Sequence, residues 1–334
     1  MRVLLPLLIS QAQGMEMYRE HRIGVVVPAY NEEALIGDTL SGIPDYVDRI
    51  YVVNDGSKDR TPQIVGEFQK KDGRIVLINH EKNMGVGKSI IDGYKAALKD
   101  GMDIVAVMAG DNQMDPAYLP DLLDPIVEGR ADYTKGNRLL GPDYVRNMPK
   151  FRYIGNMILT FLTKIASGYW HIMDPQNGYT AISKKALETI PLDKVYTWYG
   201  YPNDLLVKLN VYGFRVLDVP IPAKYGREKS KIKYTKYILK VSWLLLRDFF
   251  WRLKEKYLLY NFHPLVFFYI FGILFLLVGT GGVLFAFYQK FVLHRAVLFY
   301  YLTLSLLVFA IGLIMFLFAM LFDMEEERRN YQKR

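Results

Sequence analysis

Two long stretches without a charged residue lie near the end of the chain, and they limit the fold more than any other feature. Residues 265–289 and 296–322 contain no Asp, Glu, Lys or Arg. Each stretch exceeds the roughly 20 apolar residues that an α-helix needs to cross a bilayer. Core helices of such length are rare in soluble domains. The sequence therefore predicts an integral membrane protein with a soluble region in front of two spanning helices.

The segment between the two spans predicts a hairpin. KFVLHR (290–295) is too short to form a domain, so both ends of the hairpin lie on one side of the membrane. Between Arg215 and Lys256 there are twelve Lys or Arg residues and four Asp or Glu residues. Because basic flanks of membrane spans stay in the cytoplasm, we expect the soluble region on the cytoplasmic face. Lys290 and Arg295, between the spans, reduce the difference in basic residues between the two sides.

The chain contains no cysteine, which excludes disulfides and thiolate metal sites. Its first residues, MRVLLPLLISQAQG, only loosely resemble a signal peptide. We expect a disordered tail over residues 1–20, or a true start at Met15 or Met17.

Short apolar runs alternate with segments of helical length in the soluble region. The runs lie at 23–27, 50–54, 75–79 and 103–108, and they are rich in Val and Ile. This alternation is typical of a mostly parallel sheet covered by helices. We therefore predict a doubly wound, Rossmann-like α/β domain.

Each of the four runs is followed by polar residues. The turns read PAYNEE (28–33), NDGSKD (54–59), HEKNMGVGKS (80–89) and AGDNQMDP (109–116). In a doubly wound sheet, such turns meet over a crevice at the carboxyl ends of the strands. The four turns together predict a ligand site at this edge, although the last of them also fits a simple cap for a helix that begins near Pro116.

The glycines of the third turn exclude two common nucleotide motifs. The first turn has no glycine, so a GxGxxG fingerprint is absent, and a P-loop ending in GVGKS would need Gly where the chain has Lys82. Gly85, Gly87 and Lys88 nevertheless suit a diphosphate at a helix start. Asp55 can accept hydrogen bonds from a nucleobase, or it can cap the NDGS turn.

The basic segment before the first span is also rich in aromatic residues. Residues 232–260 mix Lys and Arg with Leu and with Trp243, Phe250 and Trp251. A helix with this composition lies in the membrane interface, with its Lys stems extended along the surface. Because the segment runs directly into a span, we expect anionic lipid as its partner and no nucleic acid.

Taken in order, these motifs resemble a known family over residues 23–322. PAYNEE, NDGSKDRT and NMGVGKS resemble the nucleotide-sugar half of the inverting GT-A glycosyltransferases of family 2. KGNR (135–138), DPQNGYTAIS (174–183) and YGREKSK (225–231), followed by the hairpin, look like its polyprenyl-phosphate branch, of the dolichol-phosphate mannose synthase type. The expected parts are a tail at 1–20, a GT-A domain at 21–230, interface helices at 231–262, a hairpin at 263–323 and a cytoplasmic tail at 324–334.

The resemblance implies a UDP- or GDP-linked sugar as donor, polyprenyl (dolichyl) phosphate as acceptor, inversion at the sugar, and Mg²⁺ or Mn²⁺ as cofactor. The donor residues that it implies, together with those of the glycine-rich turn, are Pro28, Tyr30, Glu32, Asp55, Gly85, Lys88 and Asp111. Asp111 and Gln113 match the end of a metal motif that usually reads Asp-x-Asp-x-Gln. Its first acid is Ala109 here, so we expect a retained but weaker site.

A lipid phosphate is already anionic near neutral pH, so it requires cations and positioning rather than a strong base. The resemblance places the acceptor phosphate near Arg138, Arg152, Arg227, Ser230 and Lys231. Of these we expect Arg138 and Arg152 to contribute to catalysis, together with Asp111.

Two other functions stay open. Asp204, in YPNDLL, lies where relatives that glycosylate hydroxyl groups carry a catalytic acid, so it is a candidate general base for a sugar or lipid hydroxyl. Ala109 in the metal motif also allows a non-catalytic nucleotide-sugar-binding protein. A homo-oligomer is a further expectation, because GVLFA (282–286) is a small-xxx-small pattern.

Overall fold

The computed structural model describes residues 18–139, 150–222, 234–260, 262–296 and 299–332. The chain divides into two compact units. The first comprises Met1–Thr163 and His171–Leu245, and the second comprises Lys164–Trp170 and Leu246–Arg334.

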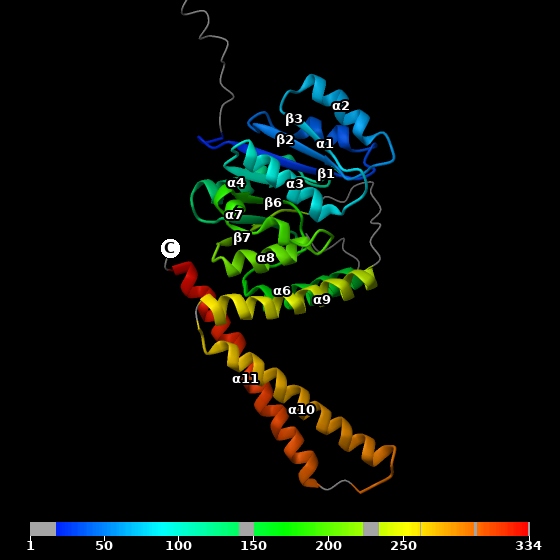
Figure 1. The fold of residues 1–334 in the computed structure, drawn as a ribbon, viewed down its shortest axis with the longest axis vertical. Helices are drawn as coiled ribbons and strands as arrows, with labels where there is room; N and C mark the ends of the chain where they lie inside the picture. Colours follow the sequence, from blue (N-terminus) through cyan, green and yellow to red (C-terminus); the bar gives the residue numbers. More distant parts are fainter. Residues whose placement is uncertain (1–17, 140–149, 223–233, 261, 297–298, 333–334) are drawn as a thin grey trace, which may run out of the picture. The chain divides into compact units, whose positions relative to one another are not determined.

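A seven-stranded sheet forms the centre of the first unit within the described residues (Figure 1). Its strands are β1 (Ile23–Ala29), β2 (Arg49–Asn54), β3 (Ile75–Asn79), β4 (Ile104–Val107), β5 (Tyr133–Asn137), β6 (Thr180–Ser183) and β7 (Val216–Pro220), in the order β3-β2-β1-β4-β6-β5-β7. Strands β1 to β4 pair in parallel, as do β5 and β7, whereas β6 is antiparallel to β4 and β5. The predicted mostly parallel α/β sheet is confirmed.

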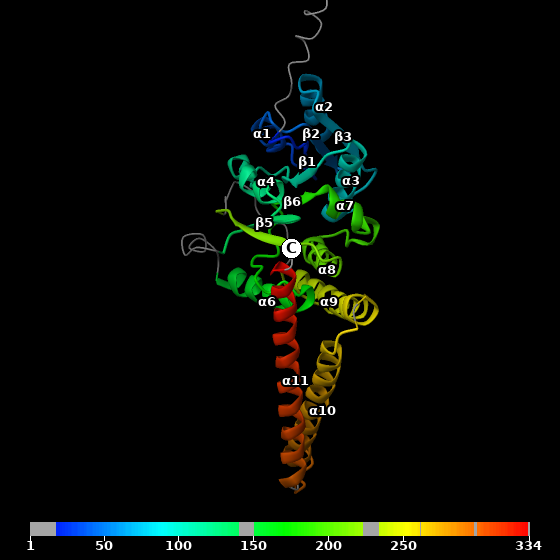
Figure 2. The same ribbon diagram turned by 90° about the vertical axis from the view of Figure 1, so that its left-hand side faces the viewer.

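Helices cover both faces of this sheet. The helices up to Val211 are α1 (Ile36–Gly42), α2 (Thr61–Lys71), α3 (Val86–Lys99), α4 (Leu119–Val127), α6 (Lys150–Ser167), α7 (Lys184–Thr189) and α8 (Tyr201–Val211), with short 3₁₀ turns η1 (Pro116–Tyr118) and η2 (Leu192–Lys194). Figure 2 shows α1 and α4 on one side of the sheet, with α3 and α7 on the other.

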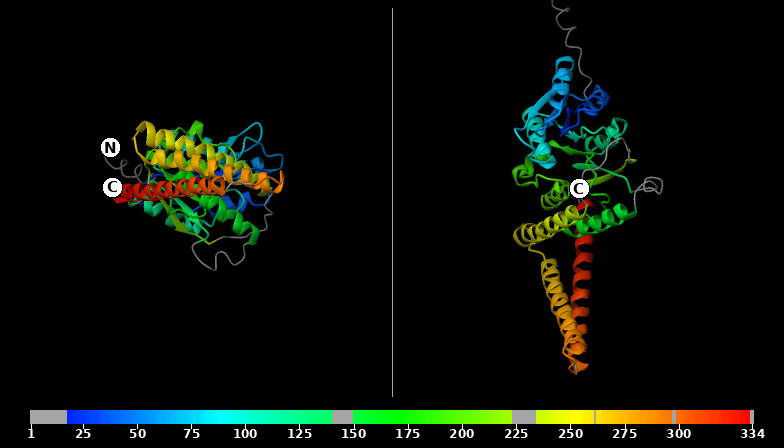
Figure 3. Two further views of the ribbon diagram at one scale, coloured as in Figure 1. Left: turned by 90° about the horizontal axis from the view of Figure 1, so that it is seen from below. Right: turned by 90° about the vertical axis from the view of Figure 1, so that its right-hand side faces the viewer.

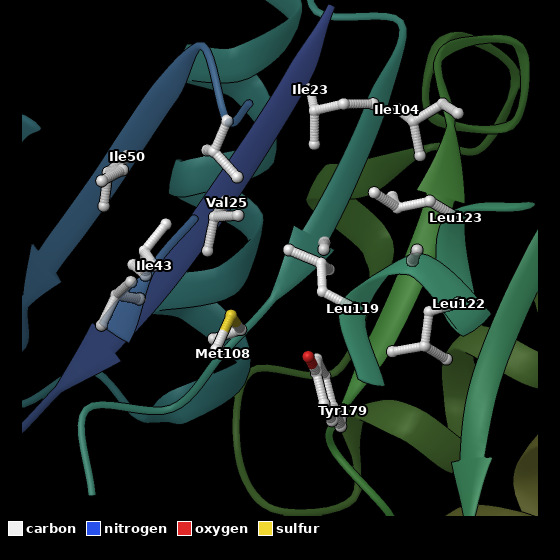
Figure 4. Close-up of a cluster of buried hydrophobic side chains, with 14 of the residues drawn as sticks. Ile23, Val25, Ile43, Ile50, Ile104, Met108, Leu119, Leu122, Leu123 and Tyr179 are labelled. Carbon is white, nitrogen blue, oxygen red and sulfur yellow. The ribbon is translucent and has the colours of Figure 1, made fainter. Parts of the chain in front are cut away.

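The core follows from the two-residue period of the strands. Val25 and Val27 of β1 point into one hydrophobic cluster, together with Leu119 and Leu122 of α4 (Figure 4). Val26, between them, faces α3 instead, where a β-carbon added to Gly93 would lie 2.3 Å from its Cγ1. Strand β1 is therefore apolar on both faces, which explains its continuous apolar run in the sequence.

The strand directions determine which loops meet. Because β1, β2, β4 and β5 run in the same direction, their carboxyl ends lie at one edge of the sheet. Strand β6 runs the other way, so the loop before Thr180 reaches the same edge. The polar turns found in the sequence are therefore brought together there, with Arg138 and the DPQNG loop.

Helix α9 (Tyr234–Arg252) follows the sheet domain, and its first part lies next to α6 (Figures 2 and 3). The Cδ1 atom of Ile238 is 3.4 Å from the place where a β-carbon on Gly155 would lie. The side chains of Leu239 and Trp243 are 68% and 72% exposed, as expected for the apolar face of an interface helix.

The second unit contains the remaining helices. The end of α9 continues into the π-helix η3 (Leu253–Tyr260), and α10 (Leu265–Phe291) and α11 (Phe299–Gln332) then form an antiparallel hairpin (Figure 1). Both hairpin helices are long and apolar enough to cross a membrane, with only 17% and 11% of their most apolar windows buried. Helix α11 continues ten residues beyond the predicted end of the span at 322, because MEEERRNYQ keeps good helix formers.

Small residues allow the two hairpin helices to approach closely. A β-carbon on Gly279 would lie 2.5 Å from the main-chain nitrogen of Phe309, and one on Gly312 would lie 2.6 Å from that of Leu276. Gly282 of the GVLFA pattern faces Ser305 in the same way. This pattern therefore serves a contact inside the hairpin, and the homo-oligomer stays a prediction.

A buried ion pair anchors the hairpin within the second unit. The guanidinium of Arg252 donates to both carboxylate oxygens of Asp323, at 2.9 and 2.8 Å, and both side chains are almost fully buried. Tyr257 donates its hydroxyl to the same carboxylate at 2.6 Å, and Arg252 also donates to the carbonyl oxygen of Ile165 at 3.0 Å. The carboxylate raises the pKa of Arg252 above its ordinary value despite burial, so the pair stays charged.

Candidate active site

A cavity of about 200 Å³ opens at the carboxyl edge of the sheet in the first unit. The turns after β1 and β4 contribute Pro28 and Ala109. The start of α8 contributes Tyr201 and Pro202, and Arg138 follows β5. Segments that are far apart in the sequence therefore line one cavity, at the edge where the sequence predicts a ligand site.

The turns after β1 and β2 hold each other in place. Asn31 has a φ of 56° and receives a hydrogen bond from the main-chain nitrogen of Lys58 at 2.8 Å. The main-chain nitrogen of Glu32 donates to the hydroxyl of Thr61 at 2.8 Å. Tyr30, at the tip of the first turn, keeps 38% of its surface exposed. The predicted nucleoside residues thus belong to a cross-linked turn with an accessible aromatic ring.

The predicted base-binding carboxylate, Asp55, is 3% exposed and holds the glycine-rich turn. Its oxygens accept the main-chain N–H groups of Met84 at 2.8 Å and Gly85 at 2.9 Å. The ring of His80 contacts it at 2.8 Å and contacts Asp92 at 3.0 Å on its other side. The predicted base-binding carboxylate therefore already has protein partners.

The glycine-rich turn requires glycine at position 85. Gly85 has a φ of 98°, and a β-carbon there would lie 2.5 Å from the carbonyl oxygen of Thr197. That oxygen accepts the main-chain N–H of Lys88 at 3.0 Å, so the turn is joined to the loop before α8. The ammonium group of Lys88 contacts Asp92 at 2.6 Å. Its predicted contact with a diphosphate would require this side chain to turn away from Asp92.

The turn after β4 contains the predicted metal ligands. One oxygen of Asp111 accepts the main-chain N–H of Gln113 at 3.1 Å, and the main-chain N–H of Ala109 donates to the sulfur of Met114 at 3.2 Å. The described residues contain no cluster of three or more His, Cys, Asp or Glu side chains that could hold a metal ion. One carboxylate and one amide fit a cation whose remaining ligands are substrate phosphates and water.

Arg138 lines the cavity in a fixed orientation. Its Nε and Nη2 atoms donate to the two carboxylate oxygens of Asp174 at 2.7 and 2.8 Å, and its main-chain N–H donates to the same group at 3.1 Å. Asp174 is fully buried and has a φ of 47°. A planar guanidinium held in this way is suited to recognise a phosphate.

Two other residues of the KGNR motif, Lys135 and Asn137, both contact Asp218. The ammonium group of Lys135, which is 1% exposed, contacts Asp218 at 2.8 Å. Asn137 donates to the other oxygen of Asp218 at 2.7 Å. The sequence analysis did not find these roles, although the spacing of two residues places Lys135 and Asn137 on the same face of a strand.

Asp204 lies on α8, and all residues of this helix are buried. Its carboxylate is 0% exposed, accepts the main-chain N–H of Tyr196 at 2.7 Å and forms an ion pair with Lys208. Among the described residues of α8, Tyr201 and Pro202 line the cavity, whereas Asp204 does not. Burial raises the pKa of Tyr201 well above its ordinary value, so this phenol stays protonated.

The remaining predicted acceptor residues cannot be placed. The side chain of Arg152, on α6, and the residues Arg227, Ser230 and Lys231 lie outside the described part of the structure.

The sheet order and the polar edge with its cavity are those of the GT-A fold. The crystal structure of glucosyl-3-phosphoglycerate synthase from Mycobacterium tuberculosis, in complex with Mn²⁺, UDP and phosphoglyceric acid, has the same fold, with a TM-score of 0.53 and 19% identity over 70% of this chain and 78% of that one. The chain belongs to glycosyl transferase family 2, whose model matches residues 24–190.

Several relatives carry names from the polyprenyl-phosphate branch. The UDP-N-acetylglucosamine–dolichyl-phosphate N-acetylglucosaminyltransferase of Methanococcus voltae is 31% identical over 61% of this chain and 86% of its own length. The dolichol-phosphate mannosyltransferase of Pyrococcus furiosus is 28% identical over 64% and 59%. The dolichyl-phosphate hexose transferase of Haloferax volcanii is 29% identical over 65% and 90%. The predicted type of enzyme, a glycosyltransferase of this branch, is confirmed.

Proposed function

We propose that this enzyme transfers a sugar from a uridine diphosphate sugar to polyprenyl phosphate, with inversion at the anomeric carbon. The names of the relatives support a dolichyl phosphate acceptor. Uridine is the base we propose, because the relative with 31% identity is named for a UDP-linked donor. The product is a lipid-linked sugar phosphate.

The observation that carries the proposal is the contrast between Arg138 and Asp204. The guanidinium of Arg138 lines the cavity and is fixed by the buried Asp174, which suits an anionic acceptor. The carboxylate of Asp204 is engaged by Lys208 inside α8. A hydroxyl acceptor needs a base to remove its proton, whereas a phosphate acceptor does not. The cavity therefore favours a phosphate acceptor over a hydroxyl acceptor.

The reaction is a single displacement. An ionised oxygen of the acceptor phosphate forms a bond to the anomeric carbon on the face opposite the leaving group. The bond between that carbon and the donor diphosphate breaks, and its electron pair leaves with UDP. No proton moves, so the protein contributes mainly positioning and charge stabilisation.

Asp111 and Gln113 are the residues that would hold Mg²⁺ or Mn²⁺, together with the diphosphate of the donor. Such a cation would stabilise the negative charge that develops on the leaving diphosphate. With Ala109 in the first position of the motif, we propose a metal affinity that depends strongly on the bound donor.

The membrane part of the proposal concerns α10 and α11. We propose that these helices span the bilayer and that the exposed apolar face of α9 lies in the interface. The excess of Lys and Arg between Arg215 and Lys256 supports a cytoplasmic location of the sheet domain. A membrane-anchored enzyme is suited to a lipid-linked acceptor.

The test compares two acceptors and two variants of the full chain in detergent. With one UDP-sugar donor, we expect a product from dolichyl phosphate and none from dolichol. Arg138→Lys cannot keep two parallel hydrogen bonds to Asp174, so we expect kcat/KM for dolichyl phosphate to fall about 10- to 100-fold. Arg215→Lys, which alters a pair with Asp132 near the start of β5, is the matched control. Transfer to dolichol, or equal activity of both variants, would contradict the proposal.

A further inference from the structure

The side chain of Gln176 is unpaired in the wall of the cavity. Within the described part of the chain, neither its amide nitrogen nor its amide oxygen has a hydrogen-bond partner, and both atoms are buried. A buried polar group without a partner destabilises the protein because its desolvation is not compensated. Such a cost is recovered when a ligand supplies the missing partners, so Gln176 indicates a polar group of a ligand.

The loop that carries Gln176 is held rigidly on both sides. Asp174, two residues earlier, is fixed by Arg138, and its carbonyl oxygen accepts the main-chain N–H of Asn177 at 3.0 Å. The side-chain oxygen of Asn177 accepts the main-chain N–H of Tyr179 at 3.0 Å. The main chain that carries Gln176 is therefore held in place, which lowers the cost of ordering a ligand contact there.

Part of the wall of this cavity is apolar. Val107, Ala109 and Met114 line the cavity, and Gly178 lies beside them. A β-carbon on Gly178 would be 3.3 Å from the Cε atom of Met114 and 3.7 Å from the hydroxyl oxygen of Tyr201. Glycine at this position thus keeps space open between an apolar side chain and a neutral phenol.

A ligand group that matches this wall has a hydrogen-bond acceptor, a neighbouring donor and a small apolar end. The 2-acetamido group of an N-acetylated amino sugar, with the adjacent 3-hydroxyl group, has these three parts. A plain hexose presents a 2-hydroxyl group instead, which would leave the apolar wall without a matching partner.

We propose that this cavity holds the donor sugar and selects a 2-acetamido hexose. The amide nitrogen of Gln176 donates to the acetamido carbonyl, and its amide oxygen accepts from the 3-hydroxyl group. The acetamido methyl group packs against Ala109 and Met114. This inference rests on the proposed function, because it places the transferred sugar in the cavity where Arg138 would hold the acceptor phosphate.

The first experiment measures donor selectivity of the full chain in detergent. With dolichyl phosphate as acceptor, we expect kcat/KM for UDP-N-acetylglucosamine to exceed that for UDP-glucose at least about tenfold, the effect of a single buried hydrogen bond. Calorimetric titration with the two donors, in the absence of acceptor, should give the same order of affinity. Equal use and equal affinity of the two donors would overturn the inference.

The second experiment changes Gln176 and uses the two donors as internal references. Gln176→Glu keeps an acceptor for hydroxyl groups but removes the hydrogen-bond donor for the acetamido carbonyl. The affinity for UDP-N-acetylglucosamine should therefore fall about 10- to 100-fold, while the affinity for UDP-glucose changes less than about threefold. Gln176→Leu should weaken both donors. Gln63→Leu, on the exposed surface of α2, is the matched control.

The variant Gly178→Ala provides an independent test of the space in the cavity. Its added methyl group contacts the flexible end of the Met114 side chain, so the fold tolerates it. The affinity for UDP-N-acetylglucosamine should fall more than the affinity for UDP-glucose. Equal losses for both donors in Gln176→Glu and in Gly178→Ala would refute the assignment. If no donor gives a lipid product, the proposed function fails, whereas the binding preference still tests the sugar assignment by itself.

Discussion

The buried pair of Asp204 and Lys208 gives a prediction that separates structural from catalytic roles. Both residues are at most 5% exposed, and the carboxylate also accepts a main-chain N–H at 2.7 Å. Asp204→Asn keeps that hydrogen bond but leaves the ammonium group buried without its counter-charge. Breaking a buried pair in this way costs about 3–5 kcal/mol. For a domain of this size, the cost corresponds to a melting temperature lower by roughly 6–20 °C.

The double variant Asp204→Asn/Lys208→Met removes both charges and keeps the shape. Replacing a buried ion pair with neutral groups of similar volume is often neutral or stabilising. We therefore expect the double variant to recover most of the lost melting temperature, measured by circular dichroism in detergent. Its transfer activity with dolichyl phosphate should stay within about threefold of the unchanged enzyme, because Asp204 removes no proton in our mechanism.

The opposite result would refute this reasoning clearly. A general base contributes about 10²- to 10⁴-fold to a rate. A double variant that is as stable as the unchanged enzyme and yet loses more than about 100-fold in kcat would show that Asp204 acts in catalysis. The acceptor would then be a hydroxyl group.

Three further predictions concern the metal, the glycine-rich turn and acid stability. EDTA should abolish transfer. Asp111→Asn should lower kcat/KM at least about tenfold and raise the Mn²⁺ concentration that gives half-maximal activity. Activity that is unaffected by both changes would contradict a metal-dependent reaction. Gly85→Ala should reduce donor affinity and stability together, because its β-carbon would lie 2.5 Å from a main-chain carbonyl oxygen of the loop before α8; an unchanged melting temperature would contradict this. Hydrogen bonds from Arg74 lower the pKa of Asp72 below its ordinary value, so this carboxylate stabilises the fold above about pH 4 and loses that effect as the pH falls through its folded-state pKa. Because Asp72 is partly exposed, unfolding at pH 7 and pH 3 should show that Asp72→Asn removes no more than about 1 kcal/mol of this dependence.

The sequence predicted the sheet and the hairpin because both rest on simple periodicity. The runs at 23–27, 50–54, 75–79 and 103–108 became β1 to β4, since apolar runs bounded by polar turns are typical of parallel strands. Strand β6 carries no such signal, because its direction depends on pairing with β4 and β5 rather than on its own residues. The end of α11 was also missed, since the charged residues after 322 mark the end of a span but not of a helix.

At the site, the sequence predicted which turns meet but not what each side chain contacts. Asp55 was assigned to a base, and the structure adds His80 and two main-chain N–H groups as its partners. Asp204 was a candidate base, and its pairing with Lys208 depends on the full burial of α8. Gln176 belongs to the DPQNGYTAIS motif, but only the structure shows that its side-chain amide has no hydrogen-bond partner among the described residues. Such contacts join distant segments, so local patterns do not encode them.

The most direct test of the central claim is one transfer reaction. The purified full chain is incubated with dolichyl phosphate, Mg²⁺ or Mn²⁺ and a panel of UDP- and GDP-sugars, and the lipid fraction is analysed by mass spectrometry. Our account predicts a single new lipid with the mass of dolichyl phosphate plus one N-acetylated hexosamine residue, formed from a UDP-linked donor. Binding of a donor without any lipid-phosphate-sugar product would contradict it.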